Sequence, residues 1–270
     1  MTEPLFFVQH LPEAGATTSL TGEEAHHAAA SRRLHPGDIL WLFDGLGGIA
    51  RATVQRVGAR GRELELRVQD RRTEPYPWPL IHLACAIPKG DRQQVLLDMA
   101  TQLGMASFTP LTCERSVVKP GTGNPERWRR ICLEACKQSR RLYLPVIHEP
   151  GSPRQVATQA ASPGADLWIA HPGDRAIPIS VLTASRNQTR AVTILVGPEG
   201  GFTQEEIDAV MAASATAVTL GRAVLRIETA AVALLAMLRL NVDSADQTGR
   251  AAENGTLKDL SSAGERSPAT

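Results

Sequence analysis

Apolar and polar residues alternate through much of the first quarter of the chain, which is the pattern of β-strands. The segments DILWLFDG (38–45), IARATVQRV (49–57) and ELELRVQD (63–70) show this alternation, and glycine-containing turns separate them. An alternating strand buries one face and exposes the other. A short helix is expected over residues 23–34, ended by Pro36 and Gly37. The pattern therefore predicts a small β-barrel domain within residues 1–73.

After a proline-rich segment, residues 74–79, the pattern changes to short apolar runs that alternate with helical segments. The segment 74–79 is the expected linker. Strands are expected at 80–87, 108–113, 167–170, 192–197 and 217–220, and helices at 91–104, 125–140, 203–213 and 228–241. This alternation predicts an α/β domain with a largely parallel sheet over residues 80–242. Residues 243–270 carry almost no large apolar side chains, which predicts a disordered tail.

The composition fits a globular protein of 270 residues, with 43% hydrophobic and only 4% aromatic residues, so that aliphatic side chains dominate the core. No apolar run approaches the roughly 20 residues of a membrane span, and the first residues do not resemble a signal peptide. A cytoplasmic location without membrane contact is therefore expected. The four cysteines, Cys85, Cys113, Cys132 and Cys136, lack the spacing of a complete metal site. We expect reduced, mostly buried thiols and no metal.

The net charge of +1 conceals an uneven distribution. Residues 76–148 carry ten basic and five acidic side chains, whereas acidic residues are in slight excess before and after them. A local positive region indicates a polyanionic partner. An ordinary solvated helix surface is the alternative, and it is the favoured interpretation for Arg127, Arg129 and Arg130.

Three loops at the ends of expected strands are candidates for a ligand site. The loop Gly-Pro-Glu-Gly-Gly (197–201) follows an apolar strand and precedes a helix that Thr203 and Glu206 would cap. The segments LGRAVLRIETA (220–230) and AHPGD (170–174) also follow strands. Ligands of parallel sheets bind at the carboxyl ends of the strands, so these loops predict a pocket for a nucleotide-like ligand. A plain connection between strand and helix is the alternative for 197–201.

Two familiar nucleotide motifs are missing from the chain. No GxGxxG motif follows a strand, and no GxxxxGK[ST] motif is present. These absences argue against a nicotinamide-dependent dehydrogenase and against a kinase of the P-loop type.

The segments LVGPEGGFTQEEI and LGRAVLRIETA together resemble the paired signature of the SPOUT class of RNA methyltransferases. More narrowly, the chain resembles the RsmE family through EEAHHAAASRRLHPGDILWLFDG, IPKGDRQQVLLDMATQLG, FTPLTCERSVVK and RWRRICLEACKQSRRLYLPVI. The resemblance covers nearly the whole chain except the tail. It implies a SPOUT-type knotted parallel sheet flanked by helices and preceded by a PUA-like β-barrel. It also implies a homodimer that uses S-adenosylmethionine to methylate N3 of one uridine in 16S rRNA, within the small ribosomal subunit.

The resemblance and the three loops together give a set of candidate site residues. The candidates for cofactor binding are Leu195, Gly197, Glu199, Gly200, Gly201, His171, Leu220, Gly221, Leu225, Arg226, Glu228 and Thr229. The candidates for RNA binding are Arg32, Arg33, Lys89, Arg92, Arg115, Arg140 and Arg141.

A chemical hypothesis follows for three of these residues. N3 of uridine carries a proton at neutral pH, which must leave before the nitrogen can accept a methyl group. Arg226 is the candidate that stabilises the developing negative charge, since a guanidinium stays charged and offers paired donors. Glu199 or Glu228 is the candidate proton acceptor. Both glutamates could instead hold loops in place.

The chain departs from the family pattern at a few positions. Ala223 stands where the family usually has arginine, Lys137 stands where it usually has glutamate, and the first-domain arginine motif is altered around residues 31–34. These departures leave two alternatives open, a relative that acts on another RNA such as tRNA and a non-catalytic RNA-binding protein. An unrelated α/β metabolic enzyme is a third alternative, against which the uneven charge argues.

Overall fold

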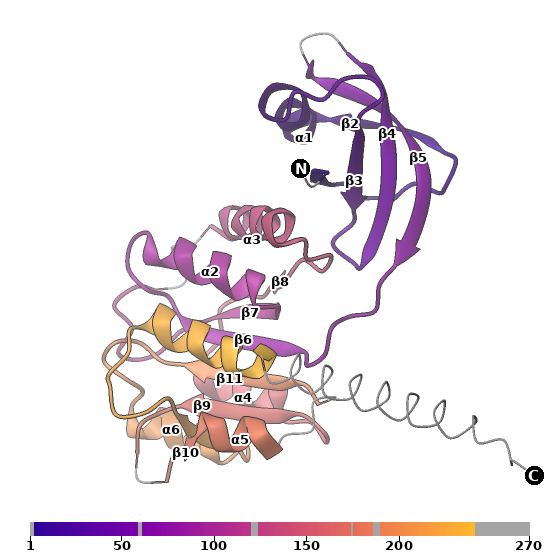
Figure 1. Cartoon of the computed structure of the whole chain (residues 1–270). Coiled ribbons are helices and arrows are strands. Elements are labelled where there is room, and N and C mark those ends of the chain that lie inside the picture. Colours follow the sequence, from indigo (N-terminus) through magenta and orange to yellow (C-terminus); the bar gives the residue numbers. More distant parts are fainter. Residues whose placement is uncertain (1–2, 59–60, 120–123, 174, 186–189, 241–270) are drawn as a thin grey trace, which may run out of the picture.

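The computed structural model describes residues 3–58, 61–119, 124–173, 175–185 and 190–240. These residues form a curled five-stranded sheet with a short helix and a seven-stranded sheet that is covered by helices on both faces (Figure 1). The linker between the two parts follows the last strand of the first sheet. The expected tail, residues 243–270, lies outside the described residues.

The N-terminal sheet contains the three expected strands, which are confirmed as β3 (Ile39–Phe43), β4 (Gly48–Val57) and β5 (Glu63–Thr73). The sequence analysis missed its two edge strands. β1 (Leu5–Phe7) pairs parallel to β3, and β2 (Thr17–Thr21) pairs antiparallel to β5. The order β1-β3-β4-β5-β2 gives a curled, barrel-like sheet. Its inward alternating positions form a separate hydrophobic core.

The helix expected over residues 23–34 is confirmed in part, since the chain is helical from Gly22 to Ser31 and changes its helix type after His26. The structure has a short helix, α1 (Gly22–His26), followed by one π-helical segment, His27–Ser31. The N–H of Arg32 donates to the carbonyl of His27, five residues earlier, at 3.1 Å. Ala25 and Ala28 are fully buried, so small side chains allow this segment to lie close to the sheet.

The second sheet is parallel throughout, in the order β10-β12-β9-β11-β6-β7-β8. The five expected strands are confirmed as β6 (Ile81–Ala86), β7 (Met105–Leu111), β9 (Asp166–Ala170), β11 (Val192–Val196) and β12 (Thr216–Thr219). The sequence analysis missed the two-residue edge strands β8 (Val146–Ile147) and β10 (Ile177–Pro178).

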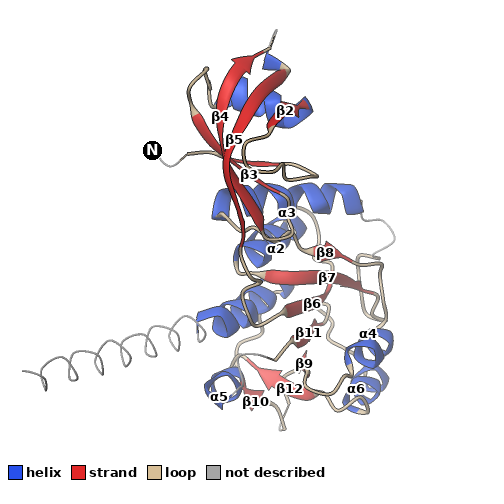
Figure 2. Ribbon diagram, turned by 90° about the vertical axis from the view of Figure 1, so that its right-hand side faces the viewer, coloured by secondary structure: helices blue, strands red, loops and turns tan. Residues whose placement is uncertain are grey.

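Helices cover both faces of this sheet (Figure 2). One face carries α2 (Arg92–Gln102), α3 (Pro125–Ser139), α5 (Ile179–Ser185) and the helix of residues 227–240, and the other face carries α4 (Pro153–Ala160) and α6 (Gln204–Met211). In β11, Ile194 packs into the core on the first face and Leu195 into the core on the second. Burial on both faces explains why this strand is a continuous apolar run.

An apolar cluster and main-chain hydrogen bonds join the two domains. Cys136 and Leu142, from the α3 region, pack in one cluster with Phe43 of β3. The N–H of Gly47 donates to the carbonyl of Leu142 at 3.1 Å, and the N–H of Leu144 donates to the carbonyl of Gly45 at 2.9 Å. The segment after α3 is therefore bonded directly to the β3–β4 turn.

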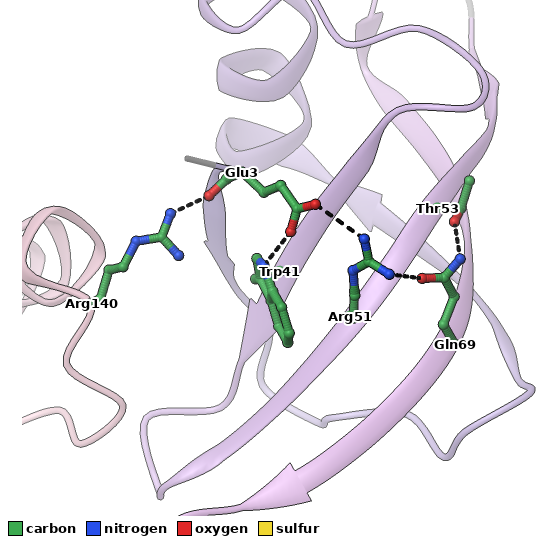
Figure 3. A network of polar contacts seen from close by, with 6 residues as sticks. All are labelled: Glu3, Trp41, Arg51, Thr53, Gln69 and Arg140. Atoms are coloured by element: carbon green, nitrogen blue, oxygen red, sulfur yellow. Dashed lines mark hydrogen bonds and ion pairs between the residues drawn. The ribbon is translucent and has the colours of Figure 1, made fainter. Parts of the chain in front are cut away.

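A polar network extends this junction across the N-terminal sheet (Figure 3). Arg140, at the end of α3, donates to the main-chain carbonyl of Glu3. The Glu3 carboxylate accepts a hydrogen bond of 2.6 Å from the indole of Trp41 and pairs with Arg51 at 3.2 Å. Arg51 in turn donates to Gln69 of β5. The network thus connects α3 to β3, β4 and β5.

A nearly buried lysine completes the junction. Lys137 of α3 is 8% exposed and pairs with Glu24 of α1 at 2.8 Å and with Glu134 at 2.7 Å. Burial alone would lower the pKa of Lys137, but the hydrogen bonds that it donates to Glu134 and Glu24 outweigh burial and raise that pKa. Glu24 also accepts the main-chain N–H of Phe7. Lys137 is therefore a contact between the two domains.

Candidate functional site

A cavity of about 370 Å³ lies at the carboxyl ends of β9, β11 and β12. Its walls are formed by residues 170–172, 196–202 and 218–225. The structure therefore brings together the three loops singled out in the sequence. Side chains of Ile227, Ala230 and Leu234 from the C-terminal helix add an apolar lining. The result is a pocket with aliphatic surfaces and main-chain edges, of the kind that holds a flat, partly polar ligand.

Glycines shape the 197–201 loop in two different ways. A Cβ atom on Gly197 would lie 2.8 Å from the ring of Phe202, which is itself buried. Gly201 has a φ of +70°, a left-handed conformation that glycine adopts without strain. The N–H of Gly201 closes the turn by donating to the carbonyl of Pro198 at 2.8 Å. Close packing at one glycine and a left-handed turn at the other give the loop its shape.

The start of α6 holds this loop from behind through the predicted capping box, which is confirmed. Thr203 Oγ1 accepts the N–H of Glu206 at 3.3 Å, and Glu206 accepts the N–H of Thr203 at 2.9 Å. Glu206 also accepts the N–H of Glu114, from the segment after β7. In the same segment, Arg115 donates to the carbonyl of Gly200 at 3.1 Å. Two side chains therefore anchor the loop to a neighbouring strand end.

The second loop leaves β12 through a left-handed glycine. Gly221 has a φ of +120°, and its N–H donates to Thr219 Oγ1 at 3.1 Å. Val224 is 96% exposed at the tip of the loop. The helix of residues 227–240 then begins, with the carbonyl of Arg226 accepting the N–H of Ala230 at 2.9 Å.

One arginine bridges two candidate carboxylates beside the cavity. Arg92 Nη2 lies 3.4 Å from Glu199 Oε1, and Arg92 Nη1 lies 3.7 Å from Glu228 Oε2. The Glu228 side chain is only 12% exposed, whereas Glu199 is 39% exposed. Glu228 Oε2 is buried without a hydrogen-bond partner among the described residues. The first turn of α2 is thus linked by charge to the 197–201 loop and to the start of the C-terminal helix.

Eight of the twelve cofactor-binding candidates line the cavity. They are His171, Gly197, Glu199, Gly200, Gly201, Leu220, Gly221 and Leu225. Leu195 is fully buried within β11, and Arg226, Glu228 and Thr229 lie at the start of the C-terminal helix, outside the lining. Binding roles for all twelve stay predictions.

The RNA-binding candidates fall into separate regions of the chain. Arg32 and Arg33 are exposed on the N-terminal domain, and Lys89 is exposed between β6 and α2. Arg92 and Arg115 contact the cavity loops as described above. Arg140 is bonded across the junction, and Arg141 is half-buried, which lowers the pKa of its guanidinium. Of the seven, the first three are therefore the candidates most open to a polyanion.

Eight further lining residues belong to the three loops but were not named as candidates, namely Ala170, Pro172, Pro198, Arg222, Ala223, Val224, Ile227 and Ala230. Five lie outside those loops and were missed, namely Val196, Phe202, Val218, Thr219 and Leu234. A signal existed for the helical members, since Ile227, Ala230 and Leu234 have the spacing of one helix face. No pattern in the sequence says that this face meets a cavity rather than another side chain.

All four cysteines are free and buried. Burial raises the pKa of Cys113 and of Cys136 to about 12 and the pKa of Cys132 to about 11. The described part of the chain shows no group of three His, Cys, Asp or Glu side chains arranged to hold a metal ion. It also contains no helix with the length and apolar character needed to cross a bilayer.

Family models assign both halves of the chain to one class. A model of an RNA methyltransferase domain matches residues 75–239, and a model of an RNA methyltransferase PUA domain matches residues 20–66. The parallel-sheet domain with its cavity and the curled N-terminal sheet are therefore those of an RNA methyltransferase.

Individual relatives define the family more narrowly. Ribosomal RNA small subunit methyltransferase E of Mycobacterium bovis is 34% identical over 87% of this chain and 90% of its own length. The protein of the same name from Synechocystis is 31% identical over 85% of this chain and 75% of its own length. A crystal structure of the Neisseria gonorrhoeae protein of that name contains bound S-adenosyl methionine. It has a TM-score of 0.77 at 28% identity, and the match covers 88% of this chain and 98% of the other. The chain belongs to the ribosomal RNA small subunit methyltransferase E family, which confirms the resemblance seen in the sequence.

Proposed function

We propose that this protein uses S-adenosylmethionine to methylate N3 of one uridine in 16S rRNA of the small ribosomal subunit. The observation that carries the proposal is the cavity between the three strand-end loops, in a chain of this family. A relative of the same family binds the cofactor in its crystal structure.

The residues around the cavity fit this cofactor. Val196, Val218 and Ile227 give aliphatic surfaces for an adenine ring, and the main chain of residues 197–201 and 220–221 can meet its polar edge. A volume of about 370 Å³ falls within the range of small-molecule sites. Glu199 places a carboxylate in the cavity wall, which suits a ligand with a positive centre.

The chemistry required of the protein is proton removal and charge stabilisation. S-adenosylmethionine, when bound, supplies a methyl group to a nitrogen that has lost its proton. Glu199 or Glu228 would hold that proton, because Glu199 lines the cavity and Glu228 pairs with the same arginine beside it. Arg226, exposed at the start of the C-terminal helix, would stabilise negative charge on the base. Glu199 is the stronger candidate acceptor since it lines the cavity, whereas Glu228 does not.

The RNA would reach the cavity across exposed basic side chains. Lys89 lies in the loop before α2, next to Arg92, and Arg32 and Arg33 extend the contact to the N-terminal domain. Affinity carried by such phosphate contacts falls as the salt concentration rises. The target base would have to be unstacked to enter the cavity.

The proposal includes the homodimer, the trefoil knot and the cytoplasmic location that the family resemblance implies. Exposed Val95 and Met99 lie four residues apart on α2 and offer an apolar patch for a second copy. The order β12-β9-β11 places the two loop-bearing strands on either side of β9, so that both loops reach one cavity. Analytical ultracentrifugation tests the dimer, for which a mass of twice 29.0 kDa is expected.

The test of function is to incubate the protein with methyl-labelled S-adenosylmethionine and small ribosomal subunits that lack this methylation. Digestion of the RNA should then yield label in 3-methyluridine from a single site. Label in bulk tRNA instead would support the alternative substrate. Cofactor binding without transfer to any RNA would support a non-catalytic protein and overturn the proposal.

A further inference from the structure

The cluster of Arg92, Glu199 and Glu228 carries an unbalanced charge at the edge of the cavity. One guanidinium faces two carboxylates, so the ionised cluster has a net charge of −1. The three residues come from different elements, namely the first turn of α2, the loop after β11 and the start of the C-terminal helix. A change at any one of the three residues therefore alters contacts of both the 197–201 loop and the start of the C-terminal helix.

Neither carboxylate is fully satisfied by the arginine. The contact to Glu228 is 3.7 Å, beyond hydrogen-bond distance, and Glu228 Oε2 is buried without a hydrogen-bond partner in the described part of the chain. A buried acceptor without a donor is costly and needs an explanation. The pKa of Cys85 reports the same negative surroundings, being raised by burial, then by Cys113 and then by Glu228 and Glu199.

A positively charged ligand in the cavity would change how the carboxylates share Arg92. Glu199 lines the cavity, so a cationic centre there competes with Arg92 for this carboxylate. The Arg92 side chain is 31% exposed, so a polyanion at the surface can contact it. Exposed Lys89 lies three residues earlier and marks this surface as accessible to a polyanion.

Resting on the proposed function, we propose that Arg92 is a positioning residue that couples the charge of the bound cofactor to RNA binding. With the cationic S-adenosylmethionine bound, Glu199 faces the cofactor and Arg92 contacts an RNA phosphate. With the product S-adenosylhomocysteine, which lacks the sulfonium charge, Arg92 returns to both carboxylates. The RNA is thereby held before methyl transfer and released after it.

The experiment measures RNA affinity with two ligands that do not react. Sinefungin carries an ammonium group where the cofactor carries its methylsulfonium, and S-adenosylhomocysteine carries no charge there. Calorimetry first confirms that both ligands saturate the protein. Filter binding of small ribosomal subunits that lack this methylation is then expected to be tighter with sinefungin by about fivefold or more. The plot of log K against log salt should be steeper with sinefungin by about 0.7, as for one added phosphate contact.

Two variants identify the residues that carry the coupling. In Arg92→Gln the RNA affinities with the two ligands should become equal, because the switched contact is gone. In Glu228→Gln the affinity with S-adenosylhomocysteine should rise towards that with sinefungin, because Arg92 is held by one carboxylate fewer. Lys89→Gln is the matched control. This change should weaken RNA binding equally with both ligands and leave their ratio unchanged.

The outcomes separate this inference from the function on which it rests. Equal RNA affinities with the two bound ligands in the wild-type protein would overturn the coupling and leave the methyltransferase proposal intact. If Arg92→Gln keeps the wild-type ratio of RNA affinities with the two ligands, the coupling would also be overturned. Failure of both ligands to bind would overturn the cofactor assignment itself. Melting temperatures of the variants check that each is folded, and Glu228→Gln provides an independent test should Arg92→Gln be unstable.

Discussion

The cavity and the domain junction are two regions of the molecule, and they are built in opposite ways. The cavity is formed by main chain, glycines and aliphatic side chains at the ends of three parallel strands. The junction is filled by an apolar cluster and is then closed by hydrogen bonds and by the pairs of Lys137. One region leaves space for a ligand, whereas the other bonds the two domains to each other.

The two regions are therefore expected to have different functions, the junction to orient the domains and the cavity to bind the ligand. A junction with a nearly buried lysine and direct main-chain bonds fixes the orientation of the N-terminal sheet relative to the cavity. RNA contacts on the N-terminal sheet would then lie at a preset distance from the reacting base. Changes in the cavity should therefore alter ligand binding, whereas changes in the junction should alter stability and leave ligand binding unchanged.

The largest effect is expected from Gly197→Ala. The added methyl group would lie 2.8 Å from the buried ring of Phe202, so the ring or the loop must move. Overpacking of this kind costs about 1–3 kcal/mol, and 1.4 kcal/mol of lost binding energy weakens affinity about tenfold. Calorimetry should show S-adenosylhomocysteine binding weakened at least about tenfold. Gly173→Ala is the control, since its nearest contact would be 3.7 Å and ordinary.

At the junction, Lys137→Met should lower the free energy of unfolding by about 2 kcal/mol, because it leaves Glu24 half-enclosed without its cation. Cofactor affinity should stay at the wild-type value. Adding Glu24→Gln should recover part of the loss, which a double-mutant cycle by urea denaturation would measure. If the Lys137→Met protein is fully folded and still binds the cofactor more weakly, the separate functions assigned to the two regions would be contradicted.

The same lysine predicts a pH dependence. The folded-state pKa of Lys137 is raised above its usual 10.5, so its contribution is fully present below that pH and is lost as pH rises through the folded-state value. The stability difference between wild type and Lys137→Met should therefore be constant through the neutral range and shrink above about pH 10.5. Urea titrations across this range measure the difference.

A smaller effect on cofactor affinity is expected to distinguish two variants that each remove a helix cap. Thr203→Ala and Ser152→Ala each remove the side-chain oxygen of a capping box, on α6 and α4 respectively, and each should cost about 1 kcal/mol of stability. Only Thr203 stands directly behind the 197–201 loop. Thr203→Ala should therefore also weaken cofactor binding, by about threefold through lost preorganisation. Equal cofactor affinities in the two variants would show that the cap does not hold the loop.

The smallest effect is expected from thiol reagents. A rise of the pKa of Cys113 from 9.0 to about 12 lowers its thiolate fraction near pH 8 by about 1,000-fold. Iodoacetamide should leave all four cysteines of the folded protein unmodified at pH 8, as judged by mass spectrometry. Stability from these neutral thiols is present below about pH 9 and is lost as pH rises towards 12. Rapid alkylation at pH 8 without unfolding would contradict the burial described here.

The sequence predicted most of the secondary structure because its signals are local. Alternation gave β3, β4 and β5, and the Thr203–Glu206 capping box located the start of α6. The edge strands β1, β8 and β10 were missed because two or three residues cannot display a period, and β2 was missed because Leu20 is its only large apolar residue. The segment 27–31 was expected to be α-helical, since nothing in its alanine-rich pattern distinguishes a π-turn from an α-turn.

The site was predicted less completely, for a physical reason. Strand-end loops could be recognised from the sequence, but contacts between distant elements could not. Arg92 was expected to bind phosphate, and its pairing with Glu199, 107 residues later, depends on how α2 packs against the sheet. Lys137 was noted only as a departure from the family, and its role at the junction depends on Glu24 in the other domain.

The most direct test of the cofactor site is a crystal structure of the protein with S-adenosylhomocysteine bound. The adenosine should occupy the cavity at the ends of β9, β11 and β12, against the main chain of residues 197–201 and 220–221. A ligand found instead in the cleft between the domains, beside Glu24 and Lys137, would contradict the assignment of the two regions.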